Sequence, residues 1–258
     1  TSPHLQRINE RFVYNNHEIS NENLSILLSE VEEINDGEQI TFFEILTAAY
    51  FYGAKKYSSN INLIESGLFH RFDATNILDK NIASIVTPIG IDHVDWLQKD
   101  ERNIDKIIFE KTSSLLNSKI IVSKQDKTET LYKIKDSLKS NKSKKIFFNE
   151  LFSYSINENN FFYYEDEYGG LRLPMPNLLG EFQLSNIATA ISTLRNIDEI
   201  EISEKDIKEG ITKIQSIARL QEIKSGKLKD LVKNNKIYVD GTHNPLGAKV
   251  LVEYLNKL

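Results

Sequence analysis

The sequence of 258 residues predicts an α/β protein built on a parallel sheet. Three short apolar runs, at residues 61–64, 82–86 and 119–122, have the length and composition of buried strands. Helical segments flank these runs, and an alternation of strand, crossover and strand is typical of a parallel sheet. An apolar content of 40% is sufficient for a proper core in a chain of this length.

Two helices are predicted ahead of the first strand. Ser20 or Asn21 can cap a helix that carries an apolar face, which consists of Leu24, Leu27, Leu28, Val31 and Ile34. Thr41 and Glu44 form a capping box for a second helix, which ends near Gly53. Because this second helix is apolar nearly all round, we expect it to be buried.

The remaining elements follow in order. Helices are predicted at 101–117, 127–138, 187–194, 203–214 and 248–258, and a last strand at 236–239. The aromatic runs IFFN, FSYSI and FFYYE predict short strands of an antiparallel annex, with a turn at Gly169 and Gly170. We expect a domain boundary near Gln215, which divides the chain into residues 1–214 and 215–258.

Composition excludes several classes of function. The net charge of −5 leaves no basic stripe for nucleic acid, and no apolar run reaches the roughly 18 residues that span a bilayer. The chain has no cysteine, which excludes thiolate metal sites. We therefore expect a cytoplasmic protein without nucleic-acid or membrane partners. Thr1 is not a methionine and Leu258 falls within an apparent helix, so we expect both ends to be cut.

Two polar residues follow predicted strands. Glu65 comes directly after the first strand, and His93 follows the second together with Asp92. Ligands of open α/β sheets collect outside the carboxyl ends of the strands, so Glu65 and His93 would converge on a metal or phosphate site there. The alternative is that Glu65 is a solvated loop residue and His93 an ordinary surface or core side chain.

Several phrases together resemble one family, that of folylpolyglutamate synthase and dihydrofolate synthase within the Mur ligase superfamily. The phrases are, in chain order, TSPHLQRINERF, TFFEILTAAYF, IESGLFHRFDATN, TPIGIDHVDWL, IIFEK, GEFQLSNIATA, ARLQEI and VDGTHNPLGA. The resemblance implies a Mur-ligase-type central domain with a parallel sheet and a small antiparallel annex over residues 1–214, without its N-terminal phosphate-loop unit. It implies that residues 215–258 begin a Rossmann-like C-terminal ligase domain.

The resemblance also implies an activity. In this family ATP phosphorylates a folate or dihydropteroate carboxylate, and the amine of L-glutamate then attacks the acyl phosphate to form an amide. Ser2, Glu65 and His93 correspond to the ligands of a divalent cation, Mg²⁺ or alternatively Mn²⁺. Lys111 corresponds to a lysine that carries a carbamate and acts in catalysis with His93, although in isolation it would be an ordinary helix-surface lysine. The family usually works as a monomer.

Two further groups of residues correspond to substrate contacts. The pterin and benzoate part of the substrate is held in the family by residues that match Thr41, Phe42, Phe43, Glu44, Phe72, Asp73 and Ala74. Aromatic rings can stack on a flat heterocycle, but Phe42 and Phe43 are also plausible core residues. The ATP contacts match Asn186, Arg219, Asp240 and, more weakly, His243.

The sequence also departs from the family pattern. No segment fits the phosphate-loop pattern G-x-x-x-x-G-K-[ST], so we expect this chain alone to turn over poorly. Phe69 and His70 replace the usual pair of glycines, and residues 112–114 differ from the usual Ala-Gly-Ile. Two alternatives stay open, a non-catalytic remnant or pterin-binding scaffold and a ligase of cell-wall precursors. The residues do not separate dihydrofolate synthase from folylpolyglutamate synthase activity.

Overall fold

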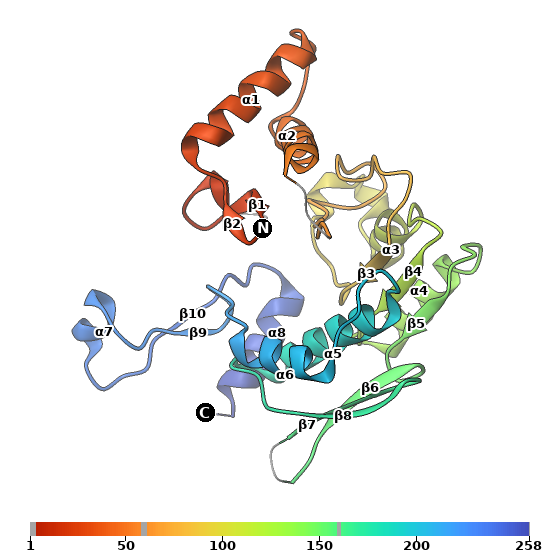
Figure 1. The fold of residues 1–258 in the computed structure, drawn as a ribbon. Coiled ribbons are helices and arrows are strands. Elements are labelled where there is room, and N and C mark those ends of the chain that lie inside the picture. The colour runs from red at the N-terminus through yellow and green to blue at the C-terminus, as the bar shows by residue number, and fades with distance from the viewer. Residues whose placement is uncertain (1–3, 58–60, 159–160, 258) are drawn as a thin grey trace. The chain divides into compact units, whose positions relative to one another are not determined.

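The computed structural model describes residues 4–57, 61–158 and 161–257 (Figure 1). The chain forms two compact units, Thr1–Asp79 and Lys80–Leu258, which are considered separately below. The domain boundary near Gln215 stays a prediction. Among the described residues, no helix has both the length and the apolar character that crossing a membrane requires.

The first unit consists of a small hairpin followed by a pair of helices. Strands β1 (Val13–Tyr14) and β2 (His17–Glu18) pair through Asn15 and Asn16, whose φ values of 51° and 64° suit a tight hairpin turn. Helices α1 (Asn21–Asn35) and α2 (Phe42–Lys56) bury their facing sides in one core. The caps are those predicted, because Ser20 accepts from the amide of Asn23, and Thr41 and Glu44 bond reciprocally.

Two predictions for this unit are wrong. Residues 61–64 form no strand, since nothing in the described part of the chain pairs with them, and Leu63 is 84% exposed. A strand is stable only when a neighbour accepts its backbone hydrogen bonds, so an apolar run alone does not define one. The second helix is not buried all round either, because Phe42 is 65% exposed and only one side of α2 packs against α1.

The second unit contains the parallel sheet. Strands β3 (Ala83–Val86), β4 (Lys119–Val122) and β5 (Lys145–Phe147) pair in that order and in parallel. Helices α3 (Ile104–Thr112) and α4 (Thr128–Ser137) make the crossovers. Ile120, Ile121 and Val122 are fully buried, as expected for a central strand covered on both faces. The predicted strands 82–86 and 119–122 are confirmed. Helix α3 begins three residues later than predicted because Asn103 caps it, and it ends at Thr112 instead of residue 117.

Helix α5 (Glu181–Asn196) joins the two sheets of this unit. It packs against β3 and β4 and also against the antiparallel sheet of β6 (Phe152–Ile156), β7 (Phe162–Asp166) and β8 (Gly169–Leu173) (Figure 1, cyan and green). An extensive apolar core lies between them. The run IFFN is therefore not part of the annex, because Ile146 and Phe147 hydrogen-bond with β4.

The last third of the unit carries short elements. These are α6 (Glu204–Lys213), β9 (Gln221–Glu222), α7 (Lys227–Val232), β10 (Tyr238–Val239) and α8 (Pro245–Leu255). Only the end of the predicted strand 236–239 is extended, and it pairs antiparallel with β9, which was not predicted. Helix α8 begins three residues earlier than predicted because Asn244 caps it and Pro245 fits its first position.

Candidate functional site

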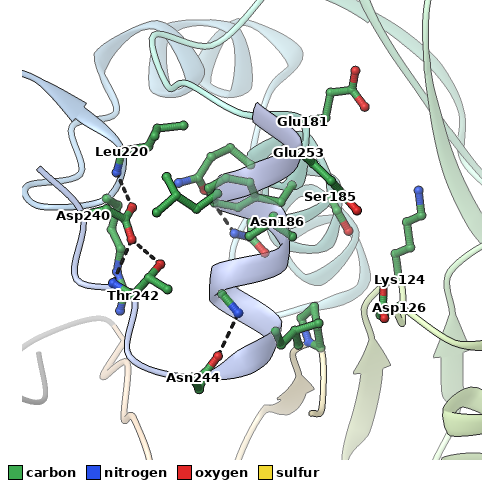
Figure 2. A pocket seen from close by; sticks show the side chains of 18 of the residues that line it. Lys124, Asp126, Glu181, Ser185, Asn186, Leu220, Asp240, Thr242, Asn244 and Glu253 are labelled. Carbon is green, nitrogen blue, oxygen red and sulfur yellow. Dashed lines mark hydrogen bonds between the residues drawn. The ribbon is translucent and has the colours of Figure 1, made fainter. Parts of the chain in front are cut away.

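A pocket of about 550 Å³ lies at the carboxyl ends of β3 and β4 (Figure 2). One wall is formed by residues that follow these strands, among them Pro88 and Lys124, and by the first turns of α5. The other wall is formed by residues 219–220, the DGTHNP loop and α8. The predicted site residues Asn186, Arg219 and Asp240 all line this pocket, although they come from three separate segments. A pocket outside the carboxyl ends of parallel strands is where α/β folds bind ligands.

Arg219 is held between two backbone positions that only a few residues adopt readily. Ala218 and Leu220 have φ values of 55° and 51°, in the left-handed region, which is costly for residues other than glycine. The Ala218 amide donates to the Gln221 side chain at 3.0 Å, and Leu220 is fully buried. The segment is thus fixed in a sharp turn that brings Arg219 to the pocket, where its guanidinium could bind phosphate oxygens.

Asp240 holds this turn against the DGTHNP loop (Figure 2). One of its carboxylate oxygens accepts from the Leu220 amide at 2.6 Å, and the other accepts from the Thr242 amide at 2.8 Å and from the Thr242 hydroxyl. The Gly241 amide also donates to the Ala218 carbonyl, at 2.8 Å. A carboxylate offers about four acceptor positions, so Asp240 keeps room for one ligand hydroxyl.

Asn186 lies on the first half of α5, on the side of the pocket that faces α8 (Figure 2). Its Nδ2 donates to Gln183 Oε1 at 3.1 Å, which orients the amide. Tyr154 lines the same pocket, and burial raises the pKa of its phenol, so the ring stays neutral there. An amide and a neutral aromatic ring in one pocket are suitable contacts for a purine base.

His93 and His243 both lie beside one carboxylate, that of Asp92. The distances to Asp92 Oδ2 are 3.7 Å from His93 Nε2 and 4.0 Å from His243 Nε2. Asn244 Nδ2 donates to the same oxygen at 2.9 Å, and the His93 amide donates to Asp92 Oδ1 at 2.8 Å. His243 is therefore placed next to the loop after β3, and neither histidine belongs to the pocket lining.

The predicted cation site has no support from the described residues. Ser2 lies outside them, Glu65 belongs to the first unit and His93 to the second. No strand delivers Glu65 to a sheet edge, which removes the reason for expecting it beside His93. In the described part of the chain, no group of three His, Cys, Asp or Glu side chains is placed to hold a metal ion. The ligand set stays a prediction.

Lys111 lies in the last turn of α3 and is half-buried. Its neighbour Glu110 is buried and pairs with Lys106 at 3.3 Å. Lys111 is not part of the pocket lining. Its predicted catalytic role therefore also stays a prediction.

The predicted folate contacts all belong to the first unit, where some of them touch. Asp73 Oδ2 accepts from the amides of Gly67 and Leu68 at 2.8 and 3.1 Å. The Phe43 ring packs over Gly67, because a methyl group at Gly67 would lie 2.6 Å from Phe43 Cζ. The start of α2 is thereby held against the 67–75 loop, which includes Ala74.

The other predicted folate contacts divide into caps and exposed rings. Thr41 and Glu44 are bonded to each other, and the hydrogen bonds from Thr41 hold the pKa of Glu44 below its usual value. Phe42 and Phe72 are 65% and 82% exposed, and the Arg71 guanidinium lies 4.0 Å from the centre of the Phe72 ring. Exposed rings of this kind are available to stack on a ligand.

Sequence reasoning missed several residues of the pocket. Lys124, Gln125 and Asp126 follow β4 directly and line its wall, so the rule that led to Glu65 and His93 would also have found them. Asp92 was named as a neighbour of His93 after the second predicted strand, but no role was assigned to it. Ser185 gives no sequence signal, since its place in the pocket depends on how α5 packs.

The fold and the pocket define a protein of the Mur-ligase-type α/β class. No family model matches the sequence. The chain is 32% identical over 259 residues to the dihydrofolate synthase/folylpolyglutamate synthase of Buchnera aphidicola subsp. Acyrthosiphon pisum, and 28% identical over 263 residues to that of Escherichia coli K12. Both matches include all of this chain, which spans 58% and 57% of the respective relatives. Dihydrofolate synthase/folylpolyglutamate synthases thus match this chain along its whole length.

Solved structures agree. The structure of E. coli FolC in complex with DHPP and ADP matches all of this chain with a TM-score of 0.86 and 27% identity, and 58% of that protein is covered. A bifunctional folylpolyglutamate synthase/dihydrofolate synthase with Mn, AMPPNP and L-glutamate bound matches with a TM-score of 0.83 and 26% identity, again with 58% covered. The predicted family and fold class are confirmed.

Proposed function

We propose that this chain forms the nucleotide-binding and folate-binding parts of an ATP-dependent ligase that joins L-glutamate to folate. The observation that carries the proposal is the meeting of Asn186, Arg219 and Asp240 in one pocket at the carboxyl ends of β3 and β4. These residues come from segments that are far apart in the sequence, and each has the chemistry for a different part of ATP.

In the proposed complex each of the three residues has one role. The Asn186 amide hydrogen-bonds to the adenine base, and the Asp240 carboxylate accepts a hydrogen bond from a ribose hydroxyl. The Arg219 guanidinium pairs with phosphate oxygens. A carboxylate oxygen of folate attacks the γ-phosphorus, the bond to the β-phosphate oxygen breaks, and ADP leaves. The glutamate nitrogen then attacks the acyl carbon, loses a proton, and inorganic phosphate leaves.

We propose that the folate contacts are those of the first unit. The exposed rings of Phe42 and Phe72 stack on the pterin or the benzoate, and Asp73 shapes the loop that presents Phe72. Dihydropteroate has the same aromatic portion, so dihydrofolate synthase activity is part of the proposal and a comparison of the two acceptors tests it.

A divalent cation, a carbamate on Lys111, a cytoplasmic location and a monomeric state complete the proposal. The relative with bound Mn, AMPPNP and L-glutamate supports a cation in the reaction. The candidate ligands are Ser2, Glu65 and His93, and the described residues offer no complete set. Crystallographic density on the Nζ atom of Lys111 tests the carbamate, because the modification is too labile for routine mass measurement.

Calorimetric titration with AMPPNP and Mg²⁺ tests the nucleotide site. Wild type should bind, and Arg219→Ala should weaken binding at least tenfold, since a charge-assisted phosphate contact is worth about 1.5–3 kcal/mol. Arg172→Ala is the matched control, because Arg172 lies on β8 over the Phe161 ring and outside the pocket. Equal affinity for wild type and Arg219→Ala would contradict the proposed site.

An assay of ADP release tests the reaction itself. We expect ADP release that requires both an acceptor, folate or dihydropteroate, and L-glutamate. Because the chain spans 58% of its relatives, we expect slow turnover from these 258 residues alone. A rate of ADP release that does not depend on L-glutamate would contradict ligase chemistry. Tight folate binding with no turnover in a chain extended to the length of its relatives would favour a pterin-binding scaffold.

A further inference from the structure

We propose that Asp92 is a positioning residue that locks the loop after β3 to the DGTHNP loop through Asn244. The two loops carry different parts of the pocket lining, Pro88 on one and Asp240 with Thr242 on the other. This inference rests on the proposed nucleotide pocket, since its measured consequence is nucleotide affinity.

The hydrogen bonds of Asp92 divide between the two loops. Its Oδ1 accepts from the His93 amide at 2.8 Å, within its own loop. Its Oδ2 accepts from Asn244 Nδ2 at 2.9 Å, across to the second loop. The side chain of Asp92 is 27% exposed, so this contact is partly shielded from water and is stronger than one on the open surface.

Asn244 uses its amide in the same two-sided way. Its Nδ2 donates to Asp92, and its Oδ1 accepts from the Gly247 amide at 2.8 Å and so caps α8 (Figure 2). One side chain thus fixes both the start of α8 and its distance from the loop after β3. Thr242, Asn244 and Gly247 all line the pocket, so this wall moves if the bond is lost.

A second contact shows that the two loops lie against each other. A methyl group on Gly90 would lie 3.1 Å from Leu246 Cβ, so the backbone of the loop after β3 packs directly on the first turn of α8. His93 has a φ of 55°, a left-handed conformation. The hydrogen bond from its backbone amide to the Asp92 carboxylate helps to hold this conformation. The lock therefore sets the conformation of one loop and the position of the other.

Exchanging the two side chains tests this role. Asn244→Asp keeps the α8 cap but places two carboxylates face to face, so we expect AMPPNP affinity to fall about tenfold, the cost of one charge-assisted hydrogen bond. The double variant combines Asp92→Asn with Asn244→Asp. In it, the new amide at position 92 accepts from the His93 backbone and donates to the new carboxylate at position 244, which still caps α8. All three hydrogen bonds are restored, so affinity should recover to within about twofold of wild type.

Two further variants separate positioning from helix capping. Asn244→Ser still caps α8 but its hydroxyl is too short to reach Asp92, so a positioning role predicts weakened AMPPNP binding, whereas a role in capping alone predicts wild-type affinity. Lys213→Gln removes an exposed ion pair with Glu209 on α6, and neither residue lines the pocket, so this control should leave AMPPNP affinity unchanged. Wild-type affinity in Asn244→Ser, or no recovery in a folded double variant, would overturn the inference. Absence of AMPPNP binding by wild type would instead overturn the nucleotide site.

Discussion

Asn244 and Asp92 are 152 positions apart in the sequence, yet their side chains are joined by a hydrogen bond of 2.9 Å. The bond connects the loop after the first parallel strand with the loop that opens α8. Lys249 and Asp126 form an ion pair farther along the same helix, and Lys257 and Glu181 form another near its end. Polar contacts from Asn244, Lys249 and Lys257 thus hold the α8 wall of the pocket to the sheet and to α5.

The first prediction concerns Gly53, which lies in α2 against the hairpin. A methyl group at this position would lie 2.3 Å from Tyr14 Oη and 2.9 Å from Leu27 Cδ2, so Gly53→Ala should destabilise the first unit by about 1–3 kcal/mol. Gly210 is the matched control, because it lies in α6 with no atom within 4 Å of such a methyl group. Gly210→Ala should stabilise by up to about 1 kcal/mol, since alanine favours helices. Urea unfolding measures both changes.

The second prediction concerns a buried ion pair that ties the antiparallel sheet to α5. The Asp166 side chain is 1% exposed, and its Oδ2 lies 3.2 Å from Arg195 Nε and accepts from the Tyr164 hydroxyl at 2.9 Å. Asp166→Asn leaves a buried guanidinium without its counter-charge and should cost about 3 kcal/mol or more in unfolding free energy.

An exposed pair provides the control for this change. Glu204 and Lys208 pair on the surface of α6, so Glu204→Gln should cost less than about 1 kcal/mol. Similar decreases in unfolding free energy for Asp166→Asn and Glu204→Gln would show that the buried pair contributes no more to stability than the exposed pair.

The third prediction concerns pH and Glu10. Three amides, those of Leu5, Gln6 and Arg7, donate to its carboxylate and lower its pKa from 4.5 to about 2. Because the folded state binds the proton more weakly than the unfolded state, the carboxylate stabilises the fold above pH 4.5. This stabilisation is lost as pH falls from about 4.5 to about 2.

Glu10→Gln removes the titrating group and so measures this effect. The difference in urea stability between wild type and Glu10→Gln should be constant above about pH 5 and should shrink towards zero near pH 2. A difference that does not vary between these limits would contradict the assignment of the lowered pKa to Glu10.

The fourth prediction concerns Phe72 and folate. The ring is 82% exposed, so Phe72→Ala should change stability by less than about 0.5 kcal/mol. A lost stacking contact is worth about 1 kcal/mol, so folate affinity should fall about fivefold. Tyr132→Ala, at an exposed ring of α4, is the control and should leave folate affinity unchanged. Fluorescence titration with folate measures both variants, and equal affinities would exclude Phe72 from the folate site.

The sequence predicted the elements whose signals are local. The capping box of Thr41 with Glu44 and the cap that Ser20 places on α1 form as expected, because both partners of each lie within one turn. The strand at 119–122 was recognised because both faces of a central parallel strand are apolar. The strand at 82–86 was recognised from its short apolar run alone, since it lies at one end of the order β3-β4-β5 and Ile85 is 41% exposed. The family resemblance located Asn186, Arg219 and Asp240, and the structure brings them to one pocket.

The failures come from features that depend on distant partners. Ile61, Leu63 and Ile64 have strand-like composition but no neighbour to pair with in the described part of the chain. Ile146 and Phe147 look like annex residues until β4 is seen beside them. The bond between Asp92 and Asn244 depends on how α8 packs against the loop after β3, which no local pattern reveals.

A crystal structure of this chain with AMPPNP tests the central claim most directly. We expect density for the nucleotide in the pocket between α5 and α8, with the base near Asn186, the ribose near Asp240 and phosphate oxygens near Arg219. A nucleotide bound elsewhere on the chain, or one in the pocket that touches none of these three side chains, would contradict it.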